Sequence, residues 1–158
     1  MASNQQVYLT PEGRDKLEEE LEYLRTAKRR DVAELIASAK EEGDISENAA
    51  YDEAKNQQAF VEGRIQDIKR ILSNSVIIDE TDEPAGVVAI GSHVTIVEDG
   101  HNDDETFRIV GSAEADPGLG LISNVSPMGK ALLGHRVGDR VSVNTPGGVL
   151  TFQIRKIA

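Results

Sequence analysis

Residues 51–72, YDEAKNQQAFVEGRIQDIKRIL, carry the pattern that decides the fold of this chain. Such a repeat of alternating three- and four-residue steps places its members on one helix face, as in the seam of a coiled coil. The stretch therefore predicts a long helix that packs along one side and is closed by residues 73–75, SNS. The seam positions are Tyr51, Ala54, Gln58, Val61, Ile65, Ile68 and Leu72.

An earlier stretch, residues 10–43, predicts a second helix of similar length. Thr10 can cap free amide groups at its start, Pro11 suits the first helical position, and Glu12 lies at the positive end of the helix dipole. Gly43 is the expected end of this helix. Its seam, again spaced by three or four residues, consists of Leu17, Leu21, Leu24, Lys28, Val32, Leu35 and Ala39.

Only a few residues around Gly43 separate the two seams, so an antiparallel helical hairpin is the compact solution. After residue 75 the pattern changes to short β-branched runs between turn residues. The predicted fold class is therefore α+β, with a long antiparallel coiled-coil hairpin over residues 1–76 and a β-rich α+β domain over residues 77–158. Strands are expected at 76–78, 87–90, 94–97, 107–110, 141–143 and 149–157, and a short helix at 127–133.

Composition narrows the function classes. The 158 residues include no Cys, which excludes a disulfide framework, a thiolate metal site and a cysteine nucleophile. The start, MASNQQVYLT, lacks the features of a signal peptide, and no apolar run is long enough to span a membrane. We therefore expect a cytoplasmic monomer without a membrane partner. A net charge of −11 indicates that any contact with nucleic acid is local.

The expected reversal point of the hairpin, residues 43–48, is acidic. Asp44 and Glu47 have the spacing of a capping box, which would satisfy free amides at the start of the second helix. The same carboxylates form a hard oxygen pair suited to Mg²⁺, although two ligands do not complete a metal site. Such a pair can work where another protein supplies further ligands. Both interpretations are open at this point, and the same residues can serve both.

The tip sequence 43–51, GDISENAAY, resembles the tip motif of the Gre transcript-cleavage factors, a family of bacterial transcription elongation factors. The similarity continues in order through 62–65 (EGRI), 107–111 (FRIVG), 126–127 (SP) and 145–148 (TPGG), and it covers nearly the whole chain. The resemblance implies a coiled coil that enters the secondary channel of RNA polymerase. It also implies an FKBP-like C-terminal domain that docks at the channel rim.

This resemblance implies a factor that is not itself an enzyme but stimulates the polymerase to cut backtracked nascent RNA near its extruded 3′ end. Asp44 and Glu47 match the essential acidic pair of the family. That pair is expected to help hold a second Mg²⁺, shared with the polymerase, and to position the attacking water. No cofactor is expected to bind the free protein stably. Modest basic character along the hairpin favours the branch of the family that acts on short backtracks.

Further residues near the tip match positions that relatives place close to RNA. Asn48 and Tyr51 belong to the tip motif, and Lys40 and Lys55 flank it on the two helices. Each of the last three has a simpler interpretation as well. Tyr51 is also the first seam residue of its helix, and lone lysines on helices commonly point into solvent.

The C-terminal domain carries the expected polymerase-docking residues. Ser126, Pro127 and Met128 match the loop and short helix that relatives use near the channel rim, and Asp116 lies in a second candidate loop. Ser126 and Met128 can equally be a helix cap and a core residue, and Asp116 can be part of a charged turn.

Two other functions are open. A homologue that occupies the channel without stimulating cleavage would share this architecture, although such relatives carry a more Asp-rich tip. The FKBP-like resemblance also raises prolyl isomerisation. That activity requires an aromatic-lined pocket, and the C-terminal domain offers only Phe107 and Phe152 as aromatic residues.

Overall fold

The structure, a computed structural model, describes residues 6–41, 48–78 and 86–158. The chain forms two compact units, Arg14–Asn74 and Met1–Gly13 with Ser75–Ala158. The N-terminal segment joins the second unit because strand β1 (Val7–Leu9) pairs in parallel with β2 (Ser75–Ile77). The predicted division into folding domains after residue 76 stays a proposal. Within the described residues, no helix is long and apolar enough to cross a membrane.

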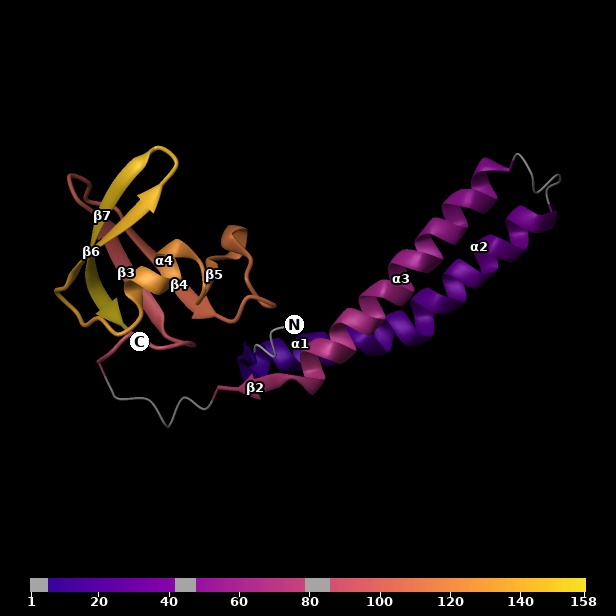
Figure 1. Cartoon of the computed structure of the whole chain (residues 1–158), viewed down its shortest axis with the longest axis horizontal. Coiled ribbons are helices and arrows are strands. Elements are labelled where there is room, and N and C mark those ends of the chain that lie inside the picture. The colour runs from indigo at the N-terminus through magenta and orange to yellow at the C-terminus, as the bar shows by residue number, and fades with distance from the viewer. Residues whose placement is uncertain (1–5, 42–47, 79–85) are drawn as a thin grey trace, which may run out of the picture. The chain divides into compact units, whose positions relative to one another are not determined.

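The predicted helical hairpin is confirmed. Helix α1 (Pro11–Tyr23), the π-helical segment η1 (Leu24–Lys28) and α2 (Arg29–Glu41) follow one another without a break. Helix α3 (Ala49–Ser73) runs back alongside them, as Figure 1 shows. The side chains buried between the helices come mainly from the predicted seams: Leu17, Leu24, Val32 and Ala39 on one arm, and Ala54, Val61, Ile65 and Ile68 on the other.

The π-helical segment explains an irregularity in the first seam. Leu24, Lys28 and Val32 follow at two successive four-residue steps, which would carry Val32 away from the seam of a regular α-helix with 3.6 residues per turn. In η1 the Arg29 N–H reaches back to the Leu24 carbonyl, so this turn accommodates one extra residue. Leu24 and Val32 are consequently both buried on the same seam.

One seam assignment is wrong. Leu35 was expected between the helices, but its side chain is 48% exposed. Beyond η1 the buried positions of α2 are Val32 and Ala39, seven residues apart, and both are small enough to let α3 approach. Leu35 therefore lies at the margin of the helix contact rather than inside it.

Two ion pairs connect the arms of the hairpin. Arg64 on α3 donates from Nε and Nη2 to the Glu20 carboxylate at 2.7 and 2.9 Å, and Arg29 does the same to Glu62 at 2.7 and 2.8 Å. The Arg64 hydrogen bonds hold the pKa of Glu20 below its ordinary value. Both pairs are bidentate, and α3 supplies the arginine in one pair and the glutamate in the other. Together they favour one antiparallel register of the two arms.

The start of α1 is capped as predicted, with one addition. Thr10 Oγ1 accepts a hydrogen bond from the Gly13 N–H at 3.0 Å. Thr10 in turn donates from its N–H and its hydroxyl to the Glu114 carboxylate, at 2.8 and 2.6 Å. A side chain at Gly13 would overlap Glu114, so glycine leaves the space that this carboxylate occupies. The N–H and the hydroxyl of the buried Thr10 are therefore both paired.

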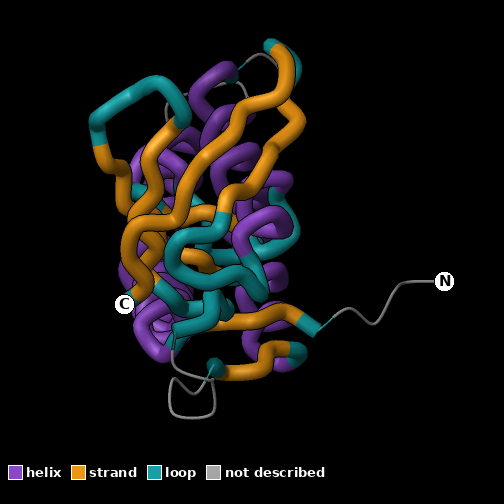
Figure 2. The backbone as a smooth tube through the Cα atoms, turned by 90° about the vertical axis from the view of Figure 1, so that its left-hand side faces the viewer, coloured by secondary structure: helices purple, strands orange, loops and turns teal. Residues whose placement is uncertain are grey.

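The second unit contains a five-stranded sheet in the order β5-β4-β3-β7-β6. Strand β3 (His93–Glu98) pairs antiparallel with β4 (Asp104–Val110) and with β7 (Gly148–Ile157), and β7 pairs antiparallel with β6 (Arg140–Thr145). Strand β5 (Leu121–Ser123) pairs parallel with β4. The short helix α4 (Pro127–Leu132) and the 3₁₀ turn η4 (Pro117–Leu119) lie on either side of β5 in sequence. Strands and loops dominate this unit (Figure 2).

Most predicted strands are present, with three differences. Residues 87–90 were expected as a strand, but Val87 makes only an isolated bridge with Arg136. A turn follows at once, because the Ser92 N–H donates to the Ala89 carbonyl and Gly91 has a φ of 99°. The apolar character of this run reflects burial of Val88 rather than pairing in a sheet. Strands β1 and β5 were missed because a three-residue strand leaves little pattern.

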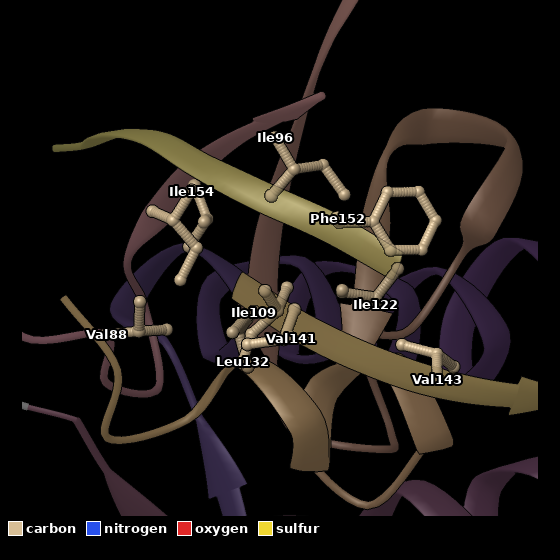
Figure 3. Close-up of a cluster of buried hydrophobic side chains, with 10 residues drawn as sticks. Val88, Ile96, Ile109, Ile122, Leu132, Val141, Val143, Phe152 and Ile154 are labelled. Atoms are coloured by element: carbon tan, nitrogen blue, oxygen red, sulfur yellow. The ribbon is translucent and has the colours of Figure 1, made fainter. Parts of the chain in front are cut away.

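The core of the sheet unit is aliphatic with one aromatic ring. Side chains from the strands and from Leu132 of α4 converge in it, as the close-up shows (Figure 3). Phe152 is buried within this cluster and Phe107 packs against it. The members are Val88, Val94, Ile96, Ile109, Ile122, Leu132, Val141, Val143, Phe152 and Ile154. The predicted α+β class is thus confirmed for the chain as a whole.

Candidate functional sites on the hairpin and beside strand β5

The distal end of the hairpin lies between the last described residue of α2, Glu41, and the start of α3 at Ala49. Asp44, Glu47 and the expected helix end at Gly43 lie outside the described residues. In sequence they fall between the end of α2 and the start of α3. At 1.5 Å per residue, the 25 residues of α3 extend about 37 Å, so this connection is far from the other end of the helix.

Asn48 holds the two arms together beside the acidic segment. Its side chain accepts a hydrogen bond from the Tyr51 N–H at 3.1 Å and therefore forms the N-cap of α3. Its Nδ2 donates to the Ala39 carbonyl of α2 at 2.5 Å. The helix starts at Ala49 with Asn48 at the cap position, and the predicted capping box of Asp44 and Glu47 lies outside the described residues.

The other expected tip residues differ in their surroundings. Tyr51 is half-buried in the first turn of α3, which agrees with its position on the seam. Lys40 is exposed near the end of α2. Lys55 is exposed on α3 and donates to the Gln58 side chain at 2.9 Å. The structure thus brings Asn48 and Tyr51 together and leaves both lysines open to solvent. The bridging role of Asn48 was missed from sequence, although an Asn before a helical run is a common capping signal.

The candidate metal ligands in this chain are the carboxylates of Asp44 and Glu47. Within the described ranges, no three His, Asp or Glu residues come together as a metal-binding group. Asp44 and Glu47 have the hard oxygen atoms that Mg²⁺ prefers, and Mg²⁺ commonly accepts one or two protein carboxylates while retaining other ligands. Because Asn48 takes the cap of α3, the helix start does not require either carboxylate. Asp44 and Glu47 thus have the donor chemistry of a Mg²⁺ ligand pair.

The expected docking residues gather at the two ends of β5. The Asp116 backbone exchanges hydrogen bonds with Leu121 at the start of β5, at 2.9 and 3.1 Å. Ser126 Oγ donates to the Ser123 carbonyl at the end of the strand at 2.6 Å, and it accepts from the Gly129 N–H at 3.1 Å. Strand β5 is at the edge of the sheet, so both segments are held at that edge.

Some docking candidates have clear structural roles. Ser126 is the N-cap of α4, and Met128 packs against the sheet core, as their simpler interpretations predicted. Pro127 and Asp116 are exposed. Two apolar side chains that the sequence analysis did not single out are also exposed here: Leu119 at 71% and Val125 at 58%. Nothing in a local pattern distinguishes such residues from core aliphatics.

Comparison with known proteins identifies the class to which this fold and these sites belong. Residues 7–77 match the family described as "Transcription elongation factor, N-terminal", and residues 83–158 match "Transcription elongation factor, GreA/GreB, C-term". The chain therefore belongs to the GreA/GreB family of transcription elongation factors, which confirms the resemblance seen in its motifs.

The similar curated relatives are described as transcription elongation factor GreA. The protein from Geobacillus kaustophilus (strain HTA426) is 53% identical over 98% of each chain, and that from Acetivibrio thermocellus is 52% identical over 99% of each chain. Among solved structures, GreA factor homolog 1 (Gfh1) of Thermus thermophilus is 34% identical, covers 98% of this chain and 99% of that chain, and has a TM-score of 0.44.

Proposed function

We propose that this protein binds RNA polymerase, places the hairpin end in the secondary channel and stimulates the polymerase to cut backtracked nascent RNA. The family and its GreA relatives support a role in transcription elongation. The observation that carries the rest is the position of the acidic segment, which connects the ends of two long antiparallel helices. A carboxylate pair at that point can reach into a channel that would exclude the sheet unit.

Asp44 and Glu47 are the proposed working residues. Their two carboxylates would supply half of a ligand set, and the polymerase would supply the other half together with the RNA phosphodiester. When bound at such a site, Mg²⁺ lowers the pKa of a coordinated water and offsets negative charge on the phosphate. The chain's own contribution is to hold two acceptors where the attacking water must be oriented, so the protein is an activator and the polymerase is the enzyme.

The residues around the pair would position it and contact RNA. Asn48 ties the start of α3 to α2 and so fixes the spacing of the two helix ends between which the pair lies in sequence. Tyr51 lies one helical turn further along α3, and Lys40 and Lys55 are exposed near the same end. We assign these three residues to contacts with the extruded 3′ end of the transcript.

The sheet unit is assigned to docking at the channel rim. Asp116 and Pro127 are exposed at the two ends of β5, beside Leu119 and Val125. Exposed aliphatic side chains with a polar border are typical of protein–protein contacts. Prolyl isomerisation is not favoured, because Phe107 packs against the core, and the small pocket that Phe152 lines is bordered by charged side chains such as Glu98 and Glu105 rather than by further aromatic rings.

The test is a stalled, backtracked elongation complex incubated with the protein and with its Asp44→Asn and Glu47→Gln variants. The parent should release short 3′ RNA fragments, and each variant should reduce the rate by at least about tenfold because the ligand set is incomplete. Binding to the polymerase should remain within about twofold, since neither substitution alters the described helices.

A matched control is Asp52→Asn, which removes an exposed carboxylate in the first turn of α3 without touching the pair. It should leave fragment release close to that of the parent. Undiminished cleavage by the Asp44 and Glu47 variants would contradict the proposed mechanism. Slower elongation by the parent with no released fragment would instead indicate a channel-binding inhibitor.

A further inference from the structure

A groove lies between α2 and α3 in the distal half of the hairpin, and its volume is about 300 Å³. The α3 side of the groove is formed by positions spaced as one helix face, which continue down the helix from its first turn. Both buried residues at the base of the groove are alanines, so the helices leave space where larger seam residues would fill it. The lining residues are Leu35, Ser38, Ala39, Ala50, Glu53, Ala54 and Gln57.

The base and the wall of the groove are mainly aliphatic. Ala39 and Ala54 are only 4% and 3% exposed and form the base. Leu35, which sequence analysis placed in the seam, stands at the margin with about half of its side chain exposed. The exposed surface of this leucine would be removed from water if another apolar side chain packed into the groove beside it. The groove is therefore suited to bind an apolar side chain.

The charge around the groove selects the kind of partner. Residues 31–57 contain eight acids and two bases, whereas 14–30 and 58–74 together contain seven acids and nine bases. The hairpin is therefore acidic only in its distal half, and Glu53 lies in the groove itself. Lys40 and Lys55 do not line the groove, so a nucleic acid phosphate placed in it would be repelled, while a basic polypeptide would be attracted.

We infer that this groove receives an aliphatic side chain from a basic polypeptide segment that lines the polymerase channel. The inference rests on the proposed entry of the hairpin into the polymerase. It adds a protein-binding site between α2 and α3 that is separate from the Asp44 and Glu47 pair. The acidic surround would steer and orient the segment, and the groove would take up its apolar side chain.

The test fills the groove without touching buried residues. Ser38 and Ala50 line it and are exposed, so Ser38→Leu with Ala50→Leu should occupy the space while preserving the fold. The matched control is Ala33→Leu, which adds the same side chain at an exposed site on α2 that does not line the groove. Circular dichroism and thermal unfolding of each variant establish that the helices are intact.

Affinity for a bacterial RNA polymerase elongation complex is then measured by competition between labelled parent and each variant. The filled variant should bind about tenfold more weakly, as expected when one buried aliphatic side chain is excluded, and the control should stay within about twofold. Glu53→Lys should also weaken binding and reduce its salt dependence. Unchanged affinity of the filled variant would overturn the inference.

A photo-crosslinking amino acid at Gln57, the lining residue of α3 that is farthest in sequence from Tyr51, identifies the occupant. A crosslink to a polymerase polypeptide supports the inference, whereas crosslinks to the transcript or to a second copy of this chain would overturn it. The cleavage rate at saturating protein separates this inference from the proposed function. A filled variant that binds weakly but cleaves normally at saturation supports the groove, and loss of cleavage in the Asp44 variant alone tests the acidic pair.

Discussion

Replacing Asn48 by Ala should loosen the hairpin end in a measurable way. The substitution removes the cap on the Tyr51 N–H and the hydrogen bond to the Ala39 carbonyl. An N-cap is worth about 1 kcal/mol, and a second, half-buried hydrogen bond adds about 1 kcal/mol. The combined loss of about 2 kcal/mol corresponds to about a 30-fold rise in the population of locally opened molecules.

Amide hydrogen exchange measured by NMR is the suitable assay, because it reports local opening without requiring the whole chain to unfold. The Tyr51 and Asp52 amides donate to the Asn48 side chain and carbonyl, respectively, and should exchange about 30-fold faster in the Ala variant. Amides near Ile65, in the buried middle of α3, should keep their protection.

Asn48→Asp separates the two contributions. Aspartate keeps an acceptor for the Tyr51 N–H but has no donor for the Ala39 carbonyl, so it should cost about half as much as Ala. Asn56→Ala, at an exposed position of the same helix, should leave exchange within about twofold of the parent. Parent-like exchange in the Ala variant would refute the role given to Asn48, and equal effects of Asp and Ala would refute its capping contribution.

Three further predictions concern stability, each measured by urea unfolding. Glu114→Ala leaves polar atoms of the buried Thr10 without their acceptor and should cost about 2–3 kcal/mol, whereas a change under about 0.5 kcal/mol would contradict the described network. Gly129→Ala should destabilise the sheet unit by at least about 1 kcal/mol, because the new Cβ would overlap the Ser123 carbonyl; parent-like stability would show that α4 can shift freely. The pKa of Glu20 is lowered by its Arg64 hydrogen bonds, so the stability from this pair is present above the ordinary carboxyl pKa and is lost as pH falls through the lowered value. Both side chains are about one-third exposed, so the loss should be only about 0.5 kcal/mol, and Glu20→Gln should abolish that part of the acid dependence.

The hairpin was predictable because helix periodicity is a local property. Steps of three and four residues place side chains on one face whatever the partner is, and the start at Thr10 and Pro11 was recognised from residue types alone. The misplacement of Leu35 shows the limit of that reasoning. A stripe gives the direction of the seam, but the width of the contact depends on how closely the facing helix approaches.

The sheet unit was predicted less completely. Strand β5 has three residues, and its pairing with β4 depends on a partner elsewhere in the chain. Val88 lies in an apolar run that resembles a strand, yet Gly91 turns the backbone before a ladder can form. Local pattern does not distinguish a residue that is buried in a loop from one that is buried in a strand.

The functional regions show the same division between what local pattern predicts and what tertiary contacts decide. Sequence alone determined the family and the helical hairpin, because these follow from motif and local periodicity. Only the tertiary structure decided that Asn48 caps α3 and ties it to α2, that Glu114 completes the cap at Thr10, and that alanines leave a groove beside Leu35. These features are contacts between residues distant in sequence, and their existence depends on how the folded chain brings those residues together.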